Sequence, residues 1–232
     1  MLATGCGRND HALRVFAASS MTDFMGEVLA TDTGGGDAYS PELNLAGSGT
    51  LLLQLSEGAR ADLVILAGSE QMDQLMKSGD FLPATEFAVT NLSVIVSPKL
   101  KGQPLSVEDL WSDRFQGAMC IISAPCGALA MKFGNSRSLD MQRLSREPNV
   151  RAVLAKVERG EVDFGLVYET DFLASQGRVG EIPGSGASQF STAYSFAISK
   201  DAKAAAWVKT LVDSITGEAG QRTLRELGFK QP

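Results

Sequence analysis

The sequence predicts an α/β protein of two doubly wound α/β lobes, joined by a two-strand hinge, with a ligand cleft between the lobes. Strand-like and helix-like segments alternate along nearly the whole chain, which favours parallel sheets with crossover helices. Two long apolar segments, residues 87–96 and 191–198, lie far apart in the sequence and are the expected hinge strands. The 232 residues, 44% hydrophobic and 21% charged, suffice for two small lobes.

The first lobe is expected to contain residues 12–89 and 193–232, after a polar leader or tether at residues 1–11. Apolar residues recur at helical spacing from Met21 to Leu29, directly after the first strand. The expected strands and helices of this lobe, in chain order, are residues 13–17, 21–29, 43–46, 61–67, 69–78, 202–211 and 218–227.

The second lobe is expected to span residues 90–192. An apolar strand at residues 118–122 leads through a short turn into a helix near Pro125. Asn149 is a good N-cap for a second helix, and a third strand ends at Tyr168 before a helix that opens with acidic residues. The apolar face of the second helix has the spacing i, i+3, i+4 and i+7 and consists of Val150, Val153, Leu154 and Val157.

Two strand–helix junctions of the first lobe share one design, in which an apolar strand runs through small hydroxyl-bearing residues directly into a helix. These junctions contain Ser20 and Ser48. A helix start leaves about four backbone N–H groups without intrahelical partners, and it carries about half a positive charge. Two such junctions facing each other therefore predict a site for a small anion. Each serine taken alone is better explained as a helix cap than as a ligand contact.

Charge and residue usage exclude several functions. The formal net charge is −6 and no run of Lys or Arg is long enough to bind nucleic acid. No apolar stretch approaches the roughly 20 residues that cross a bilayer. The single histidine, His11, lies in the polar leader, so Ser-His or Cys-His catalysis lacks a positioned base. We expect no enzyme, no catalytic residue and no direct protein–metal ligand, with a hydrolase as the remote alternative.

The three cysteines do not form a disulfide framework by their spacing. Cys120 lies in an apolar strand and is expected in the core, while Cys126 is expected in a loop. Small residues directly before Cys6 are similar to the end of a bacterial lipoprotein signal, which makes Cys6 a candidate for lipidation. An accidental small-residue leader explains the same residues equally well.

Taken together, several segments resemble the periplasmic molybdate-binding proteins of bacterial ABC importers, which have a type II periplasmic-binding-protein fold. The resemblance extends over nearly the whole chain from Leu13 onward. The segments that carry it are residues 15–22 (VFAASSMT), 46–51 (AGSGTL), 58–63 (GARADL), 125–127 (PCG), 149–151 (NVR) with 157–161 (VERGE), and 165–168 (GLVY).

The resemblance implies which residues contact the ligand. Hydroxyl and backbone N–H groups are expected from Ser20 and Ser48, and the phenol from Tyr168. Backbone N–H groups alone are expected from Cys126 and Val150. Ser19 replaces Ser20 as hydroxyl donor if the first helix begins one residue earlier. The loop before Pro125 is shorter than in many members of the family, which affects the expected cavity size.

The resemblance also implies the function. We expect a monomeric binding protein, without a cofactor, that captures molybdate or tungstate and delivers it to the membrane permease of an ABC importer. Its expected location is the periplasm or the cell surface, with a lipid on Cys6 as a possible anchor. A binding protein for another small oxyanion or solute on the same scaffold is the alternative.

Overall fold

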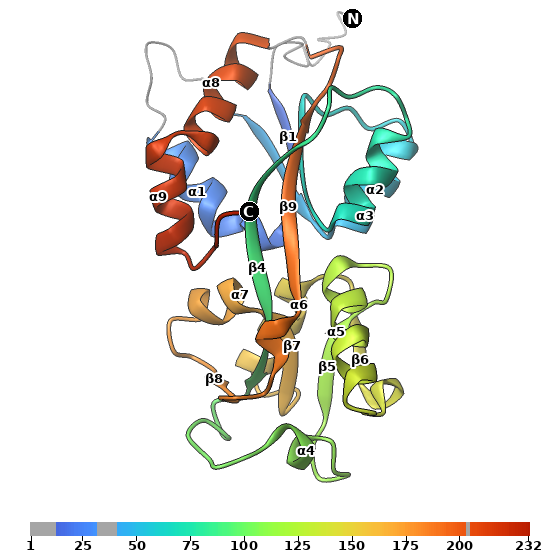
Figure 1. The fold of residues 1–232 in the computed structure, drawn as a ribbon, viewed down its shortest axis with the longest axis vertical. Helices are drawn as coiled ribbons and strands as arrows, with labels where there is room; N and C mark the ends of the chain where they lie inside the picture. The colour runs from blue at the N-terminus through green and yellow to red at the C-terminus, as the bar shows by residue number, and fades with distance from the viewer. Residues whose placement is uncertain (1–12, 32–40, 203–204) are drawn as a thin grey trace, which may run out of the picture.

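A computed structural model describes residues 13–31, 41–202 and 205–232, and it has two lobes arranged along the long axis (Figure 1). Strands β4 (Thr85–Val96) and β9 (Ser191–Ile198) run through the boundary between the lobes. The first half of β4 pairs with β9 and its second half, from Leu92, pairs with β7 (Phe164–Tyr168). The predicted hinge strands and the two-lobed α/β fold class are confirmed.

The sheets are mixed rather than parallel throughout. The strand order is β2-β1-β3-β9-β4-β7-β5-β6, with β8 paired to β4. The outer strands of each lobe are parallel, as the alternation of strands and helices predicts, but both hinge strands run antiparallel to their neighbours. The reason is that the chain must cross between the lobes in both directions.

In the first lobe, helices α1, α8 and α9 cover one face of the sheet and α2 and α3 cover the other (Figure 1). The predicted closing helix at residues 202–211 is longer than expected, because Val212 and Ile215 continue its apolar spacing and Ile215 is fully buried. The elements are β1 (Arg14–Ala18), η1 (Ser19–Met21), α1 (Thr22–Thr31), β2 (Glu42–Ala46), α2 (Ser48–Ser56), β3 (Leu63–Ala67), α3 (Ser69–Met76), α8 (Ala205–Thr216) and α9 (Glu218–Glu226).

The second lobe follows the sequence prediction in its core helix, which begins after Asn149. The Asn149 side chain accepts a hydrogen bond from the N–H of Ala152, and the predicted apolar face is buried. The elements are α4 (Val107–Leu110), β5 (Gly117–Cys120), α5 (Pro125–Ser136), η2 (Met141–Arg143), β6 (Ser145–Glu147), α6 (Val150–Glu158), β7, α7 (Glu169–Ala174), β8 (Gly180–Glu181) and η3 (Ala187–Gln189).

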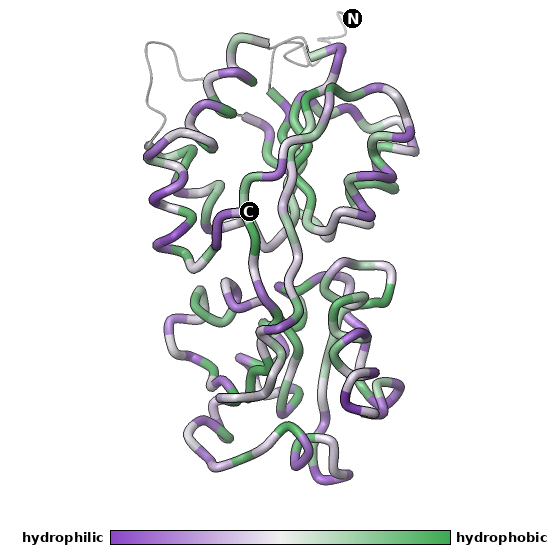
Figure 2. Tube along the Cα trace, viewed as in Figure 1, coloured by the Kyte–Doolittle hydropathy of each residue, from purple (hydrophilic) through white to green (hydrophobic). Residues whose placement is uncertain are grey.

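The inner strands consist mainly of apolar residues, whereas polar and apolar residues alternate along the outer helices (Figure 2). This pattern is typical of sheets buried on both faces by amphipathic helices. The predictions for the leader at residues 1–11, and for His11 and Cys6 within it, concern residues outside the described part of the chain.

Candidate ligand site between the lobes

A small cavity lies between the lobes, where strands end and helices begin on both sides. Its volume, as space for the centre of a water-sized sphere, is about 10 Å³, which is room for about one water molecule. All five predicted site residues line it, together with Ser19. The complete lining is Ala18, Ser19, Ser20, Gly47, Ser48 and Ala67 from the first lobe, and Ala124, Pro125, Cys126, Asn149, Val150 and Tyr168 from the second.

Three helices begin at this cavity, and the first N–H groups of a helix have no partner within that helix. Helices α2 and α5 begin after Gly47 and Ala124, and neither helix has a side-chain cap. In α6 the Asn149 side chain accepts a hydrogen bond from the N–H of Ala152 and not from the N–H of Val150. Because a helix start carries partial positive charge, three such starts around one small space favour an anion there.

Neither serine acts as a helix cap, so that interpretation is wrong. Ser48 is the first residue of α2, and its Oγ accepts a hydrogen bond from the N–H of Ala67 at 3.1 Å. Ser20 lies inside the 3₁₀ turn η1, and its Oγ accepts a hydrogen bond from the hydroxyl of Tyr194 at 2.8 Å. Tyr194 was not predicted as part of the site, because nothing in the hinge-strand pattern distinguishes it from other buried residues.

Tyr168 contributes a buried phenol from the end of β7. Its side chain is 1% exposed, and its hydroxyl has no hydrogen-bond partner among the described residues. Burial, followed by the influence of Tyr194 and Asp171, raises the pKa of Tyr168 well above its usual value. The phenol is therefore protonated at neutral pH and presents one O–H donor.

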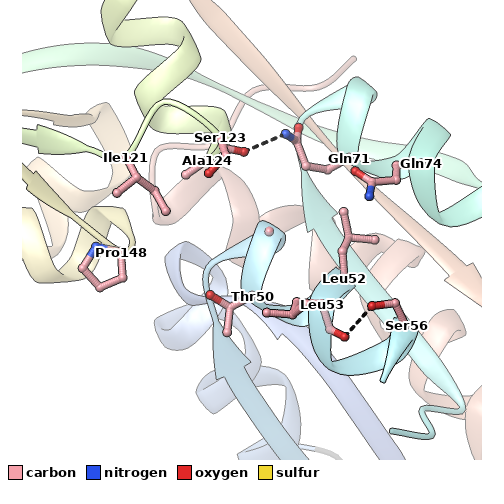
Figure 3. Close-up of a pocket in the computed structure, with 11 residues that line it drawn as sticks. Thr50, Leu52, Leu53, Ser56, Gln71, Gln74, Ile121, Ser123, Ala124 and Pro148 are labelled. Atoms are coloured by element: carbon pink, nitrogen blue, oxygen red, sulfur yellow. Dashed lines mark hydrogen bonds between the residues drawn. The ribbon is translucent and has the colours of Figure 1, made fainter. Parts of the chain in front are cut away.

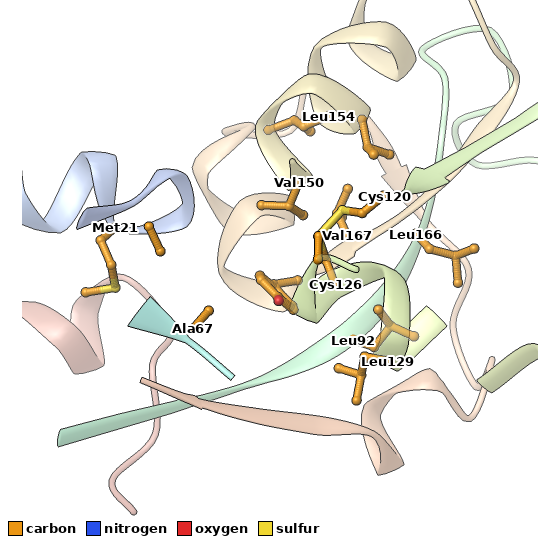
Figure 4. Packing of buried hydrophobic residues seen from close by; sticks show 14 of the residues in the cluster. Met21, Ala67, Leu92, Cys120, Cys126, Leu129, Val150, Leu154, Leu166 and Val167 are labelled. Carbon is orange, nitrogen blue, oxygen red and sulfur yellow. A yellow bond between two sulfur atoms is a disulfide. The ribbon is translucent and has the colours of Figure 1, made fainter. Parts of the chain in front are cut away.

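A disulfide joins Cys120, at the end of β5, to Cys126, in the first turn of α5. Cys120 is fully buried, as expected of a core residue, whereas Cys126 lies in a helix and not in a loop. The tight strand–helix turn brings the two side chains together in a disulfide that their spacing did not predict. Figure 4 shows this bond beside Val150 and Val167, on the second-lobe side of the cavity. The disulfide ties down the segment that carries Ala124 and Cys126 to the cavity wall.

Among the described residues, no charged side chain lines the cavity, but a charge cluster lies close behind it. Arg151, next to Val150, forms an ion pair with Asp171 in α7, with 2.7 Å between Nε and Oδ1. It also pairs with Asp23 in α1, so this contact crosses from one lobe to the other. Asp171 is fully buried, and burial raises its pKa to about 7 despite the nearby guanidinium. Sequence reasoning missed this cluster because its members come from three helices.

A second, larger space lies outside the cavity. It is an open groove of about 410 Å³ between α2, α3 and the segment from Ile121 to Ala124 (Figure 3). The Gln71 side chain donates a hydrogen bond to the carbonyl of Ser123 across it, at 3.3 Å. Its size alone would favour it as a site, but its wall includes exposed apolar side chains such as Leu53 and Ile121. The convergent donors are in the inner cavity.

Other site chemistries find no support in the part of the chain that the structure describes. Within it, no group of three or more His, Cys, Asp or Glu side chains is arranged to hold a metal ion. None of its helices combines the length and the hydropathy that a membrane span requires.

Comparison with known proteins identifies the family. A profile of the bacterial extracellular solute-binding proteins matches residues 13–230. The chain belongs to this family. The molybdate-binding protein ModA of Mycobacterium tuberculosis is 30% identical over 221 residues, which cover 94% of this chain and 84% of ModA. A putative ABC transporter substrate-binding lipoprotein of Bacillus subtilis, YvgL, is 28% identical over 99% of this chain and 93% of its own length.

A solved structure supports the fold of this solute-binding protein. The periplasmic molybdate-binding protein of Azotobacter vinelandii superposes with a TM-score of 0.81 and 17% identity, over 95% of this chain and 99% of that one. The resemblance stated from the sequence is thus confirmed at the level of the family. Its members bind solutes for ABC transporters; they are not enzymes and carry no cofactor.

Proposed function

We propose that this solute-binding protein captures molybdate or tungstate in the cavity between its lobes. The observation that carries the proposal is that Ser20, Ser48, Cys126, Val150 and Tyr168, from both lobes, line one small cavity without a charged side chain. The named function of the 30% identical mycobacterial ModA supports the choice of oxyanion. The cavity is far too small for an amino acid or a sugar, and at about 10 Å³ it must also widen, by movement of the lobes about β4 and β9, to admit a tetrahedral oxyanion.

Neutral donors supply the binding energy in this proposal. Each hydrogen bond to a charged partner contributes roughly 1.5–3 kcal/mol. The five residues offer one or two donors each. Their summed hydrogen-bond free energy, reduced by the free energy of immobilising the ion and closing the lobes, is enough for micromolar affinity or better. A fully deprotonated tetrahedral anion accepts from every donor, whereas a protonated one brings an O–H to a site without an acceptor. Closure of the lobes about β4 and β9 would enclose the ion.

The proposed location is outside the cytoplasm. There the protein, as a monomer, would deliver the ion to the membrane permease of an ABC importer. The buried Cys120–Cys126 disulfide supports this, because disulfides persist in oxidising compartments. The name of YvgL as a lipoprotein supports a lipid on Cys6. The intact mass of protein extracted from membranes tests the anchor: a mass equal to that of the unmodified chain would count against it.

A thermal-unfolding screen tests the choice of ligand, with molybdate, tungstate, sulfate, phosphate and chromate as the panel. A ligand that binds only the folded state stabilises it by about 2.7 kcal/mol at 100 times its Kd. Molybdate and tungstate are expected to raise the unfolding midpoint most. Ser20→Ala and Ser48→Ala should each weaken molybdate binding several-fold in calorimetry without unfolding the protein. Wild-type affinity in both variants would refute the site.

Sulfate is the second candidate, because it is also a tetrahedral dianion that only accepts hydrogen bonds. A sulfate-binding protein of Mycobacterium tuberculosis, SubI, shares the fold with a TM-score of 0.75 at 13% identity. Sulfate is smaller than molybdate, so the same donors would make longer contacts to it. A larger thermal shift with sulfate than with molybdate would select this candidate.

A further inference from the structure

Both cavity serines already accept a hydrogen bond from the protein. The donors are the hydroxyl of Tyr194 for Ser20 and the N–H of Ala67 for Ser48. Ala67 and Tyr194 are direct partners in the antiparallel pairing of β3 with β9. One pair of opposite residues in the sheet therefore fixes both serine hydroxyls, one through the main chain and one through a side chain.

The direction of the hydrogen bond between Tyr194 and Ser20 follows from what surrounds the phenol. Tyr194 is fully buried, and its ring packs edge-on against Phe229 and Tyr168, with centroids 5.3 and 6.3 Å away. Within the described part of the chain, Ser20 Oγ is the acceptor found for its hydroxyl. A buried O–H that lacks an acceptor is costly, so the phenol proton is directed to Ser20.

This arrangement restricts where the Ser20 proton points. A serine hydroxyl has one proton and two lone pairs. With one lone pair occupied by Tyr194, the proton and the second lone pair take the two remaining directions, neither toward the phenol, and the cavity is where Ser20 meets open space; a bound anion there draws the proton toward itself. The same reasoning applies to Ser48, whose lone pair is occupied by a main-chain N–H that no side-chain substitution removes.

We propose that Tyr194 is a positioning residue that fixes Ser20 as a hydrogen-bond donor, and that it thereby sets the preference of the site for fully deprotonated oxyanions. The inference rests on the proposed function and deepens it. A serine that rotates freely offers a lone pair to the O–H of a protonated anion, but a serine fixed as donor faces that O–H with its own proton. A site that leaves the O–H of a protonated anion without an acceptor rejects that anion strongly.

Tyr194→Phe tests this inference, because phenylalanine keeps the ring contacts and removes only the hydroxyl. Calorimetry at neutral pH compares molybdate and sulfate, which carry no proton, with inorganic phosphate, which carries at least one. We expect the Kd for molybdate to rise about threefold to tenfold, the loss of one favourable donor orientation. The Kd for phosphate should stay unchanged or fall, so the ratio of the phosphate Kd to the molybdate Kd decreases by at least about threefold. A merely loosened cavity would weaken all three anions together.

A double-mutant cycle with Ser20→Ala shows whether Tyr194 acts through Ser20. In the Ser20→Ala background, adding Tyr194→Phe should leave the molybdate Kd unchanged within about twofold. Thr90→Val is the matched control: it removes a buried hydroxyl from the neighbouring hinge strand, where Thr90 contacts Thr170 at 3.4 Å and does not line the cavity. This control should keep wild-type affinities.

Three outcomes overturn the inference: an unchanged ratio in Tyr194→Phe, an equal effect of Tyr194→Phe with and without Ser20, or a loss of affinity shared by all three anions. If Tyr194→Phe does not fold, Ser20→Ala alone decides, because it should weaken molybdate more than phosphate and an unchanged ratio refutes the inference. Wild-type protein that binds no oxyanion would instead refute the proposed function, so the two failures are distinguishable.

Discussion

Gly47→Ala is the sharpest test of lobe closure, because Gly47 lies where the two lobes touch. A Cβ atom added at Gly47 would lie 2.8 Å from the carbonyl oxygen of Pro148 and 3.3 Å from Cβ of Asn149, both on the opposite lobe. The backbone of Gly47, with φ −62° and ψ 141°, suits alanine as well as glycine. The conflict therefore exists only while the lobes are closed.

The magnitude follows from the size of that conflict. Ordinary contacts of a Cβ atom begin near 3.4 Å, so the lobes would have to separate by about 0.6 Å at this contact. The obstructing atom belongs to the backbone and cannot rotate away. Overpacking of this kind costs about 1–3 kcal/mol, which corresponds to a roughly fivefold to 150-fold rise in the Kd for an ion held by both lobes.

Calorimetry with molybdate measures the affinity, and small-angle scattering with and without molybdate measures closure. Gly49→Ala is the matched control on the same helix, since its added Cβ would meet only the carbonyl of Ser123 at an ordinary 3.8 Å. We expect Gly49→Ala to bind like wild type and Gly47→Ala to bind weakly with incomplete closure. Equal affinity in Gly47→Ala and wild type would refute a close approach of Gly47 to Pro148 in the ion-bound protein.

Three further predictions concern the elements around the cavity. Replacing Cys120 and Cys126 by alanine should lower the free energy of unfolding by about 2 kcal/mol, because the disulfide removes the loop-closure entropy of a six-residue separation from the unfolded chain. Urea denaturation measures this loss, and an unchanged midpoint contradicts it. The pKa of Asp171 is about 7 in the folded protein against the usual 3.8. Because the folded protein binds this proton more tightly than the unfolded chain, protonation of Asp171 stabilises the fold at low pH. This contribution to the free energy of unfolding, up to about 4 kcal/mol, is lost as the pH rises from about 4 to 7. Asp171→Asn should therefore flatten the pH dependence of unfolding in that window, and a profile like that of wild type would refute the shift. Asp23→Asn breaks only the ion pair of Arg151 that crosses the lobes, so molybdate affinity should fall about twofold to fivefold at low salt and less at high salt; a salt-independent effect would exclude an electrostatic cause.

The sequence was sufficient where local patterns decide the structure. The hinge strands and the start of α6 follow from apolar runs, helical spacing and the Asn149 cap, all of which act within a few residues. It was insufficient where partners are distant. Tyr194 and Ser20 are separated by 174 residues, and only the strand order places one beside the other. The disulfide was missed for another reason: its formation depends on the turn geometry between Cys120 and Cys126, which spacing alone does not fix.

The division of the donors between the lobes links affinity to closure in the proposed site. Ser20 and Ser48 belong to one lobe, and Cys126, Val150 and Tyr168 belong to the other. Neither set encloses a tetrahedral ion, so each lobe alone would bind it weakly. A lysine or arginine in the cavity would attract anions to the open lobes as well, but the guanidinium of Arg151, which follows Val150 in the chain, is already paired with two carboxylates. In the proposed function, an uncharged cavity of this kind would hold its ion only while the lobes are closed and release it when they separate, as delivery to a permease requires.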